Sequence, residues 1–305
     1  LNVVNQLRLW SMDSFGEDLI ANVRAGGIYY WDYTNYTNRA VALSDLAGAN
    51  LAPTLGLQVL VSDIDRHVIV LGADPLNSNL TARTGAIDPL LIAFSDQENV
   101  AEWEPTSTNT AGSLRCSAGS QIIGGLRARQ ETLIWTDVAL YSLQFIGAPL
   151  TFGLNLINEG VSLIGPNASI NTPTGIFWMD KKGFYSYQGA VQPVPCSVHS
   201  YVFDDLNEDQ AFQVFGFLNK QFDEVGWFYC SGTNTTIDKY VTYNYVDKTW
   251  SIGELSRTAW LDEGIANVPR AAGYDGDNNY IYSHETGFDD DGAPMDNVFI
   301  ESADF

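Results

Sequence analysis

The residues whose types and spacing come closest to a binding site are acidic and lie after Arg270. Asp275-Gly276-Asp277-Asn278-Asn279 has the D-x-D-x-N opening of a calcium-binding loop. Such a loop carries a bidentate Glu at its twelfth position, where this chain has Thr286. A run of Asp and Asn beside Gly is also typical of a tight turn. We favour the turn, although Asp289-Asp290-Asp291 could add oxygen ligands, and we predict no metal site.

The same residues belong to a strongly uneven charge distribution. The chain has 37 Asp and Glu against 15 Lys and Arg, a net charge of −22. No Lys or Arg follows Arg270, whereas nine acidic residues do. A negative surface repels phosphates and disfavours tight nucleic-acid binding. The candidate residues for an acidic surface or lumen are Asp275, Asp277, Asp289, Asp290 and Asp291. A solvated acidic face without further function is the alternative.

Other residue types offer little chemistry. The three histidines, His67, His199 and His284, stand more than 80 residues apart and lack an H-x-x-x-H partner for metal binding. The three cysteines are odd in number and include no C-x-x-C pair, so we expect neither a disulfide framework nor a zinc site, and folding in a reducing cytoplasm. No phosphate-binding G-x-x-x-x-G-K-[ST] loop occurs. We therefore predict no catalytic, cofactor-binding or metal-binding residues and no enzyme.

A carbohydrate-binding or glycoside-hydrolysing propeller is the alternative function. Paired carboxylates can act as acid and base on a sugar, and this chain is rich in Asp, Glu, Trp and Tyr. Ser95-Asp96 followed by Trp103 faintly resembles a sialidase Asp-box. However, the motif S-x-D-x-G-x-T-W separates the Ser and Asp that are adjacent here. No particular carboxylate pair stands out.

Short runs of aromatic and β-branched residues must form the elements that position these side chains. Each run ends near Gly, Asp or Asn, which is typical of strands joined by hairpin turns. The predicted strands lie within 7–10, 18–23, 28–32, 58–62, 67–71, 90–94, 121–123, 132–136, 139–145, 175–179, 184–188, 227–229, 239–245, 250–252 and 279–284. A weak internal repeat relates LIWTDVALYSL, from Leu133, to IFWMDKKGFYSY, from Ile176. Repeats of a few tens of residues indicate a radial or stacked β architecture.

The fold class that follows is all-β, a β-propeller-like arrangement of about five to six blades of short antiparallel strands. We predict a single domain over 1–305. A Pro- and Asn-rich surface connection is expected near 155–173, and a short helix-like segment near 201–212. Apolar runs are too short to span a bilayer, so no membrane segment is expected.

Several runs resemble a known family. Trp10-Ser11-Met12-Asp13-Ser14-Phe15-Gly16-Glu17-Asp18-Leu19-Ile20-Ala21, followed by Gly26-Gly27-Ile28-Tyr29-Tyr30-Trp31-Asp32, is similar to the opening of phage tail nozzle and tail tubular proteins. Further runs fit the same family at 95–103, 129–137, 151–153, 201–206, 227–229 and 257–261. The likeness covers most of the chain. Nozzle proteins are often longer, with platform or fibre-docking regions that we do not expect within these 305 residues.

The resemblance implies a structural protein of the virion, made in the cytoplasm of a bacterial host. Such subunits are β-propellers that assemble as a ring, typically sixfold, at the distal end of a short tail and form a conduit for genome ejection. The implied partners are copies of the chain itself and other tail proteins such as adaptor and fibres, with genomic DNA passing through without specific binding. A negative lumen suits that role, because it repels the DNA backbone and lets the duplex slide.

Overall fold

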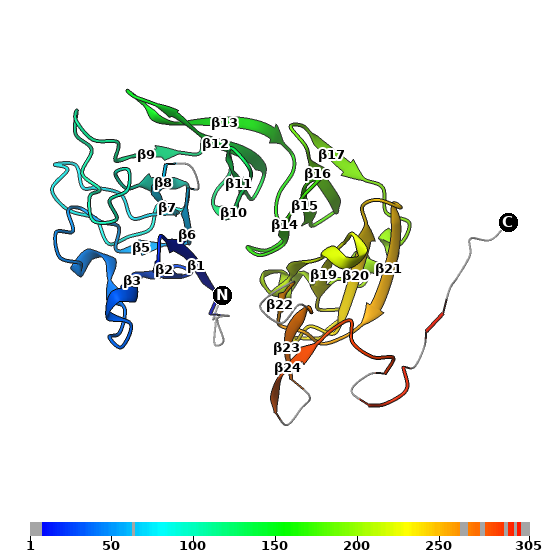
Figure 1. Ribbon diagram of the computed structural model, residues 1–305. Helices are drawn as coiled ribbons and strands as arrows, with labels where there is room; N and C mark the ends of the chain where they lie inside the picture. Colours follow the sequence, from blue (N-terminus) through cyan, green and yellow to red (C-terminus); the bar gives the residue numbers. More distant parts are fainter. Residues whose placement is uncertain are drawn as a thin grey trace.

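The computed structural model describes residues 8–62, 65–262, 268–274, 278–289, 292–295 and 298–299. The strands form six antiparallel sheets, which follow one another along the chain and stand around a common centre (Figure 1). The protein is therefore a six-bladed β-propeller. This confirms the prediction of an all-β propeller with five to six blades of short antiparallel strands.

Each blade is built from strands that are consecutive in the chain. Blades 1 and 2 contain β1 Trp10–Phe15, β2 Asp18–Val23, β3 Gly26–Trp31, β4 Val41–Ala42 and β5 Leu55–Gly56, then β6 Gln58–Val61, β7 Val68–Leu71, β8 Leu91–Phe94 and β9 Gly112–Arg115. Blades 3 and 4 contain β10 Ile122–Arg127, β11 Thr132–Thr136, β12 Ala139–Gly147 and β13 Thr151–Glu159, then β14 Ser169–Thr172, β15 Gly175–Asp180, β16 Gly183–Tyr187 and β17 Val191–Val194. Blades 5 and 6 contain β18 Phe215–Asn219, β19 Glu224–Tyr229, β20 Lys239–Asn244 and β21 Thr249–Glu254, then β22 Ala259–Leu261, β23 Arg270–Tyr274 and β24 Asn279–Ser283.

The first strand of each blade faces the centre. From β1 through β6, β10, β14 and β18 to β22, each first strand contacts the first strand of the next blade. Every connection within a blade is antiparallel, as expected for strands joined by short turns. The described part of blade 6 has three strands, whereas blades 2 to 5 have four each.

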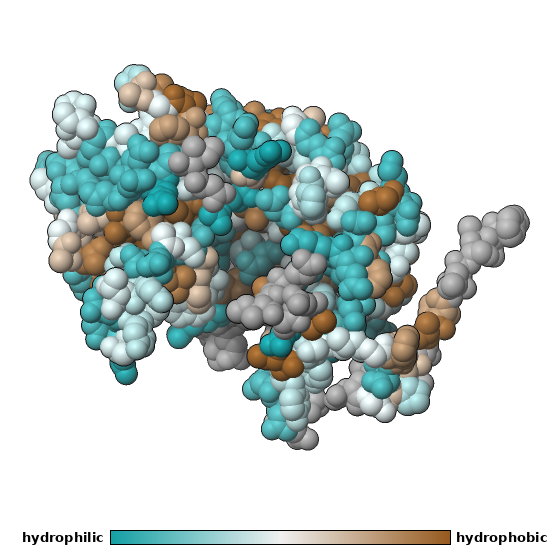
Figure 2. Space-filling model, in the orientation of Figure 1, coloured by the Kyte–Doolittle hydropathy of each residue, from teal (hydrophilic) through white to brown (hydrophobic). Residues whose placement is uncertain are grey.

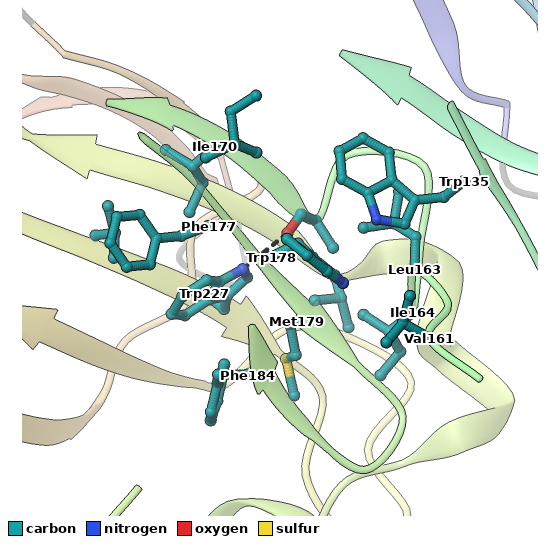
Figure 3. Packing of buried hydrophobic residues seen from close by; sticks show 14 of the residues in the cluster. Trp135, Val161, Leu163, Ile164, Ile170, Phe177, Trp178, Met179, Phe184 and Trp227 are labelled. Carbon is teal, nitrogen blue, oxygen red and sulfur yellow. Dashed lines mark hydrogen bonds between the residues drawn. The ribbon is translucent and has the colours of Figure 1, made fainter. Parts of the chain in front are cut away.

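Buried tryptophans on second strands fill the seams between blades. Trp135 on β11, Trp178 on β15 and Trp227 on β19 are each fully buried (Figure 3). The rings of Trp135 and Trp178 meet edge to face, with centroids 5.4 Å apart. The indole N–H of Trp227 donates to the carbonyl of Ala168 in the preceding blade, at 2.9 Å. The repeated Trp of the sequence is thus a repeated core position.

The Asp of the W-x-D repeat has an equally local role. Asp137 and Asp180 each accept both the backbone N–H and the hydroxyl of one serine, which joins the turn after the second strand to the segment before the first strand of the same blade. The same two-bond contact to a Ser or Thr recurs in four blades. The pairs are Asp74 with Thr54, Asp96 with Thr110, Asp137 with Ser120, Asp180 with Ser162 and Asp238 with Ser231. Part of the acidic surplus therefore stabilises turns.

The surface connection predicted near 155–173 is wrong. Residues 155–159 complete β13, and residues 169–172 form β14. Between them, Val161, Leu163 and Ile164 are buried and join the core around Trp135 and Trp178. The Asn, Pro and Gly that suggested a loop instead allow a tight passage from blade 3 to blade 4.

The helix-like segment predicted near 201–212 divides into two short helices. α1 covers His199–Phe203, and the 3-10 helix η3 covers Glu208–Gln213, where Asn207 caps the first turn. Other short 3-10 helices are η1 Tyr33–Asn35, η2 Leu43–Asp45 and η4 Lys220–Phe222. No helix in the described ranges is long and apolar enough to cross a membrane.

Candidate functional site

Most of the predicted acidic residues fall outside the described structure. Asp275, Asp277, Asp290 and Asp291 are not among the described residues. Asp289 is described, and it is exposed, with its carboxylate accepting the backbone N–H of Gly292 at 3.0 Å. The acidic surface or lumen at these positions stays a prediction.

A second acidic segment lies within the described residues, between blades 4 and 5. Four of the six residues from 204 to 209 are Asp or Glu, and Asp204, Glu208 and Asp209 are exposed. Asp205 forms an ion pair with Lys239 at 2.8 Å. The sequence reasoning interpreted this segment only as helix-like, although its run of acidic residues was visible. Negative charge is therefore exposed in more than one part of the molecule.

Two carboxylates come together where blade 5 meets blade 6. The side-chain amide of Asn219 donates to Glu285 at 2.9 Å, and Asn219 is the cross-strand neighbour of Glu224. Burial raises the pKa of Glu224, and the negative charge of Glu285 raises it further. Within the described ranges, no three His, Cys, Asp or Glu side chains are placed to hold a metal ion. The pair makes this seam sensitive to protonation.

A buried polar chain that sequence reasoning missed connects the loops of blade 2. His67 is fully buried, and its Nδ1 is in close contact with the carboxylate of Asp65. Its Nε2 lies 2.9 Å from the hydroxyl of Thr110, which donates to Asp96 at 2.6 Å. Burial would raise the pKa of Asp96, but hydrogen bonds from Thr110 outweigh it and hold that pKa below its usual range.

The order Asp65, His67, Thr110 is that of a nucleophilic triad, but the geometry favours a structural role. A nucleophile presents its hydroxyl to a substrate while the histidine accepts its proton. Here the hydroxyl proton of Thr110 is directed to Asp96. The ring of His67 packs against Phe145 and Phe152, with centroids 5.7 and 5.1 Å away. His67 therefore fixes the adjoining blade 3 to blade 2.

Blade 3 extends beyond the other blades through the hairpin of β12 and β13. These strands are nine residues long, the longest in the described structure, and a turn at 148–150 joins them. The hairpin reaches the rim beside blade 2, where Figure 2 shows hydrophobic side chains (Figures 1 and 2). Ile146 is 53% exposed and Leu150 68% exposed. A protruding apolar hairpin of this kind is a feature of binding surfaces.

The rim of blade 1 carries a hollow. It has a volume of about 260 Å³ and lies beside β3, β4 and the short helices η1 and η2. Half of its lining residues are apolar or aromatic, and the other half are polar or charged: Asp32, Asn35, Asn38, Arg39 and Asp45. Binding pockets commonly combine apolar and aromatic walls with polar groups that fix the orientation of the bound group.

One side chain spans the centre of the propeller. Arg24 follows β2 in blade 1, yet its guanidinium donates to the carbonyl of Ile122 in blade 3 at 3.3 Å. It also lies 5.4 Å from the ring centroid of Phe212, just before blade 5. Burial lowers the pKa of Arg24 to about 10. Contacts with blade 3 and with η3 place this side chain of blade 1 in the centre of the propeller, which it obstructs at this level.

The sequence matches no protein-family model and is similar to no curated protein. Solved structures share the fold. The computationally designed Ika8 protein aligns with a TM-score of 0.51 and 9% identity, over 90% of this chain and 70% of that one. Hsv2 of Kluyveromyces lactis gives 0.47 and 9%, over 95% and 78%. The GH74 enzyme of Niastella koreensis gives 0.47 and 10%, over 86% and 40%. At these identities the likeness concerns the fold alone.

Proposed function

We propose that this protein is a structural subunit of a bacteriophage tail nozzle. Copies of the chain would assemble into a ring, typically sixfold, around a negatively lined conduit for genome ejection. Adaptor and fibre proteins of the tail would be its neighbours. The proposal begins from the resemblance of residues 10–32 and the further runs to nozzle and tail tubular proteins.

The observation that carries the proposal is a net charge of −22 on a propeller whose rim exposes apolar side chains. Phosphates are repelled by such a surface, so DNA can pass without being bound. Exposed apolar groups serve the other requirement, because assembly must bury apolar surface to outweigh repulsion between like-charged copies. Exposed large side chains outside the first strands include Tyr33, Tyr36, Ile146, Leu150 and Leu156.

The position of Arg24 adds a condition to the proposal. Since its side chain crosses the axis of the propeller, the conduit has to lie between copies and not through one of them. The acidic residues that line it would then be on the rim or faces of each propeller. The exposed segment 204–209 is a candidate alongside Asp289.

Imaging of the assembled particle tests the proposal. Negative-stain micrographs of the purified chain, or of the virion that carries it, should show closed rings with a central opening wide enough for duplex DNA. A chain that stays monomeric at every concentration, and whose melting temperature rises only on adding a glycan, would support the carbohydrate-binding alternative instead.

A further inference from the structure

The hairpin of β12 and β13 is neutral in a chain that is otherwise strongly acidic. Between Asp137 and Glu159 there is no Asp, Glu, Lys or Arg, although charged residues make up 17% of the whole sequence. Its exposed residues are mainly apolar, among them Phe145, Ile146 and Leu150. A surface strand normally carries charge toward water and so avoids pairing with other chains. The absence of charge here therefore indicates a surface that becomes covered.

The hairpin is held rigidly in place. Phe152 packs on Phe94 with centroids 4.9 Å apart and on Phe145 at 5.8 Å. Both Phe145 and Phe152 also contact the buried ring of His67. A preorganised protrusion loses little conformational entropy when it binds, which favours tight association. Ile146 and Leu150 are thus fixed anchors at the end of a stiff hairpin.

The hollow on blade 1 is a receptor of suitable size and character. Its volume is about 260 Å³, and a cavity of about 150 Å³ can hold a benzene molecule. One or two aliphatic side chains would fit. Tyr30 and Trp31 supply aromatic walls, and the exposed Tyr33 and Tyr36 flank them. Tyrosine and tryptophan are enriched where protein interfaces gain most of their affinity.

We infer that the tip of the β12–β13 hairpin of one copy inserts into the blade 1 hollow of a second copy. The inference rests on the proposed ring and names the surfaces that build it. Each copy carries one protrusion and one hollow on different blades, so the contact is head to tail, the arrangement that produces rings when it closes. Charge is compatible with the same pair, because an uncharged protrusion meets no like charge when it enters a hollow that is lined by Asp32, Arg39 and Asp45.

Complementary variants test this contact through the size of the assemblies. Leu150→Asp places a charge on the protrusion, and Ala47→Trp fills the hollow, which Ala47 lines at an exposed position. In analytical ultracentrifugation we expect each variant alone to weaken self-association by at least about thirtyfold. An equal mixture should form one-to-one dimers, because one protrusion and one hollow stay intact. Leu80→Asp, at an apolar residue that is 61% exposed on blade 2, is the matched control and should assemble normally.

The outcomes separate the contact from the proposed function. If the wild type forms rings and Leu150→Asp forms the same rings, the contact is refuted while the nozzle proposal stands. If the mixture of variants forms no dimer, the pairing of protrusion with hollow is refuted. A wild type that is monomeric throughout overturns both. Binding of the wild-type hairpin to neutral phosphatidylcholine vesicles, lost in Leu150→Asp, would assign the protrusion to lipid and overturn the contact.

Discussion

At the scale of single residues, His67 is the polar group on which most local contacts depend. It joins Asp65 to Thr110 and, through that hydroxyl, to Asp96, while its ring supports Phe145 and Phe152 of the next blade. Buried polar groups are costly unless each has a partner. Thr110 therefore supplies the hydrogen-bond partner that Nε2 of the buried His67 needs.

Removing that hydroxyl should destabilise the fold. We expect Thr110→Val, which preserves the shape of the side chain, to lower the free energy of unfolding by about 1–3 kcal/mol, the usual cost of an unsatisfied buried polar group. Chemical denaturation measures the change. Thr108→Val, two residues away and exposed, is the control and should change stability by less than about 0.5 kcal/mol. Equal effects of the two substitutions would contradict the structural role of Thr110.

Sequence patterns identified the residues that recur at a fixed spacing within a hairpin. Trp135 and Asp137, like Trp178 and Asp180, recur within single hairpins, and their spacing was sufficient to predict blades. His67 gave no comparable signal, because only its partner Asp65 is near in the chain and Thr110 is 43 residues away. Arg24 was missed for the same reason, since Ile122 is 98 residues away. Contacts between blades depend on the closure of the circle, which no local pattern records.

At the scale of elements, the seam between β19 of blade 5 and the chain that follows β24 of blade 6 depends on protonation. The folded state raises the pKa of Glu224, first through burial and then through Glu285. The folded protein therefore binds more protons than the unfolded chain above the ordinary glutamate pKa of 4.5. This contribution favours folding at low pH and is lost as the pH rises through the raised value.

Glu224→Gln should remove that dependence. We expect the variant to be more stable than the wild type at pH 7, by up to about 1 kcal/mol, the scale of partly exposed charge pairs. The difference should shrink as the pH falls toward 4.5. Thermal melts across this range measure it. Glu254→Gln, at an exposed carboxylate, is the control. A stability gain that is the same at every pH would contradict the proposed cause.

The prediction of secondary structure was wrong where the composition of a segment suggested a surface loop but its apolar residues are buried. Residues 155–173 combine Asn, Pro and Gly with apolar residues, and the first group suggested a surface loop. The apolar residues determine the outcome, because Val161, Leu163 and Ile164 fill a seam between two blades. The segment 201–212 forms two short helices because η3 begins at a new cap, Asn207. Packing between blades and helix capping therefore determine the structure of these two segments.

At the scale of the whole molecule, Arg24 connects blades that are distant around the circle. Its contacts with Ile122 and Phe212 bring blades 1, 3 and 5 together at the axis. We expect Arg24→Ala to lower the free energy of unfolding by about 1–3 kcal/mol, through loss of a cation–π contact and a buried hydrogen bond. Arg129→Ala, at an exposed arginine, should have little effect on the denaturation midpoint. An Arg24→Ala variant as stable as the wild type would show that these contacts of Arg24 do not stabilise the propeller.

The charge and the apolar hairpin also belong to this scale. A chain of −22 repels its own copies, so assembly requires neutral surfaces that approach closely. The uncharged β12–β13 hairpin provides one such surface, and in the hollow of blade 1 Arg39 partly offsets Asp32 and Asp45. The remaining carboxylates stay available to a shared conduit. The net charge follows directly from the sequence. The positions of the hairpin and the hollow could be seen only in the structure, because they lie on separate blades, 3 and 1.

Direct imaging of the wild-type chain is the measurement that tests the central claim most directly. Negative-stain or cryogenic electron microscopy, at concentrations where sedimentation shows assembly, should reveal closed rings of propellers around an opening that admits duplex DNA. The propellers themselves should show no open axis. Monomers at all concentrations, or open chains of propellers without a central opening, would contradict the nozzle proposal.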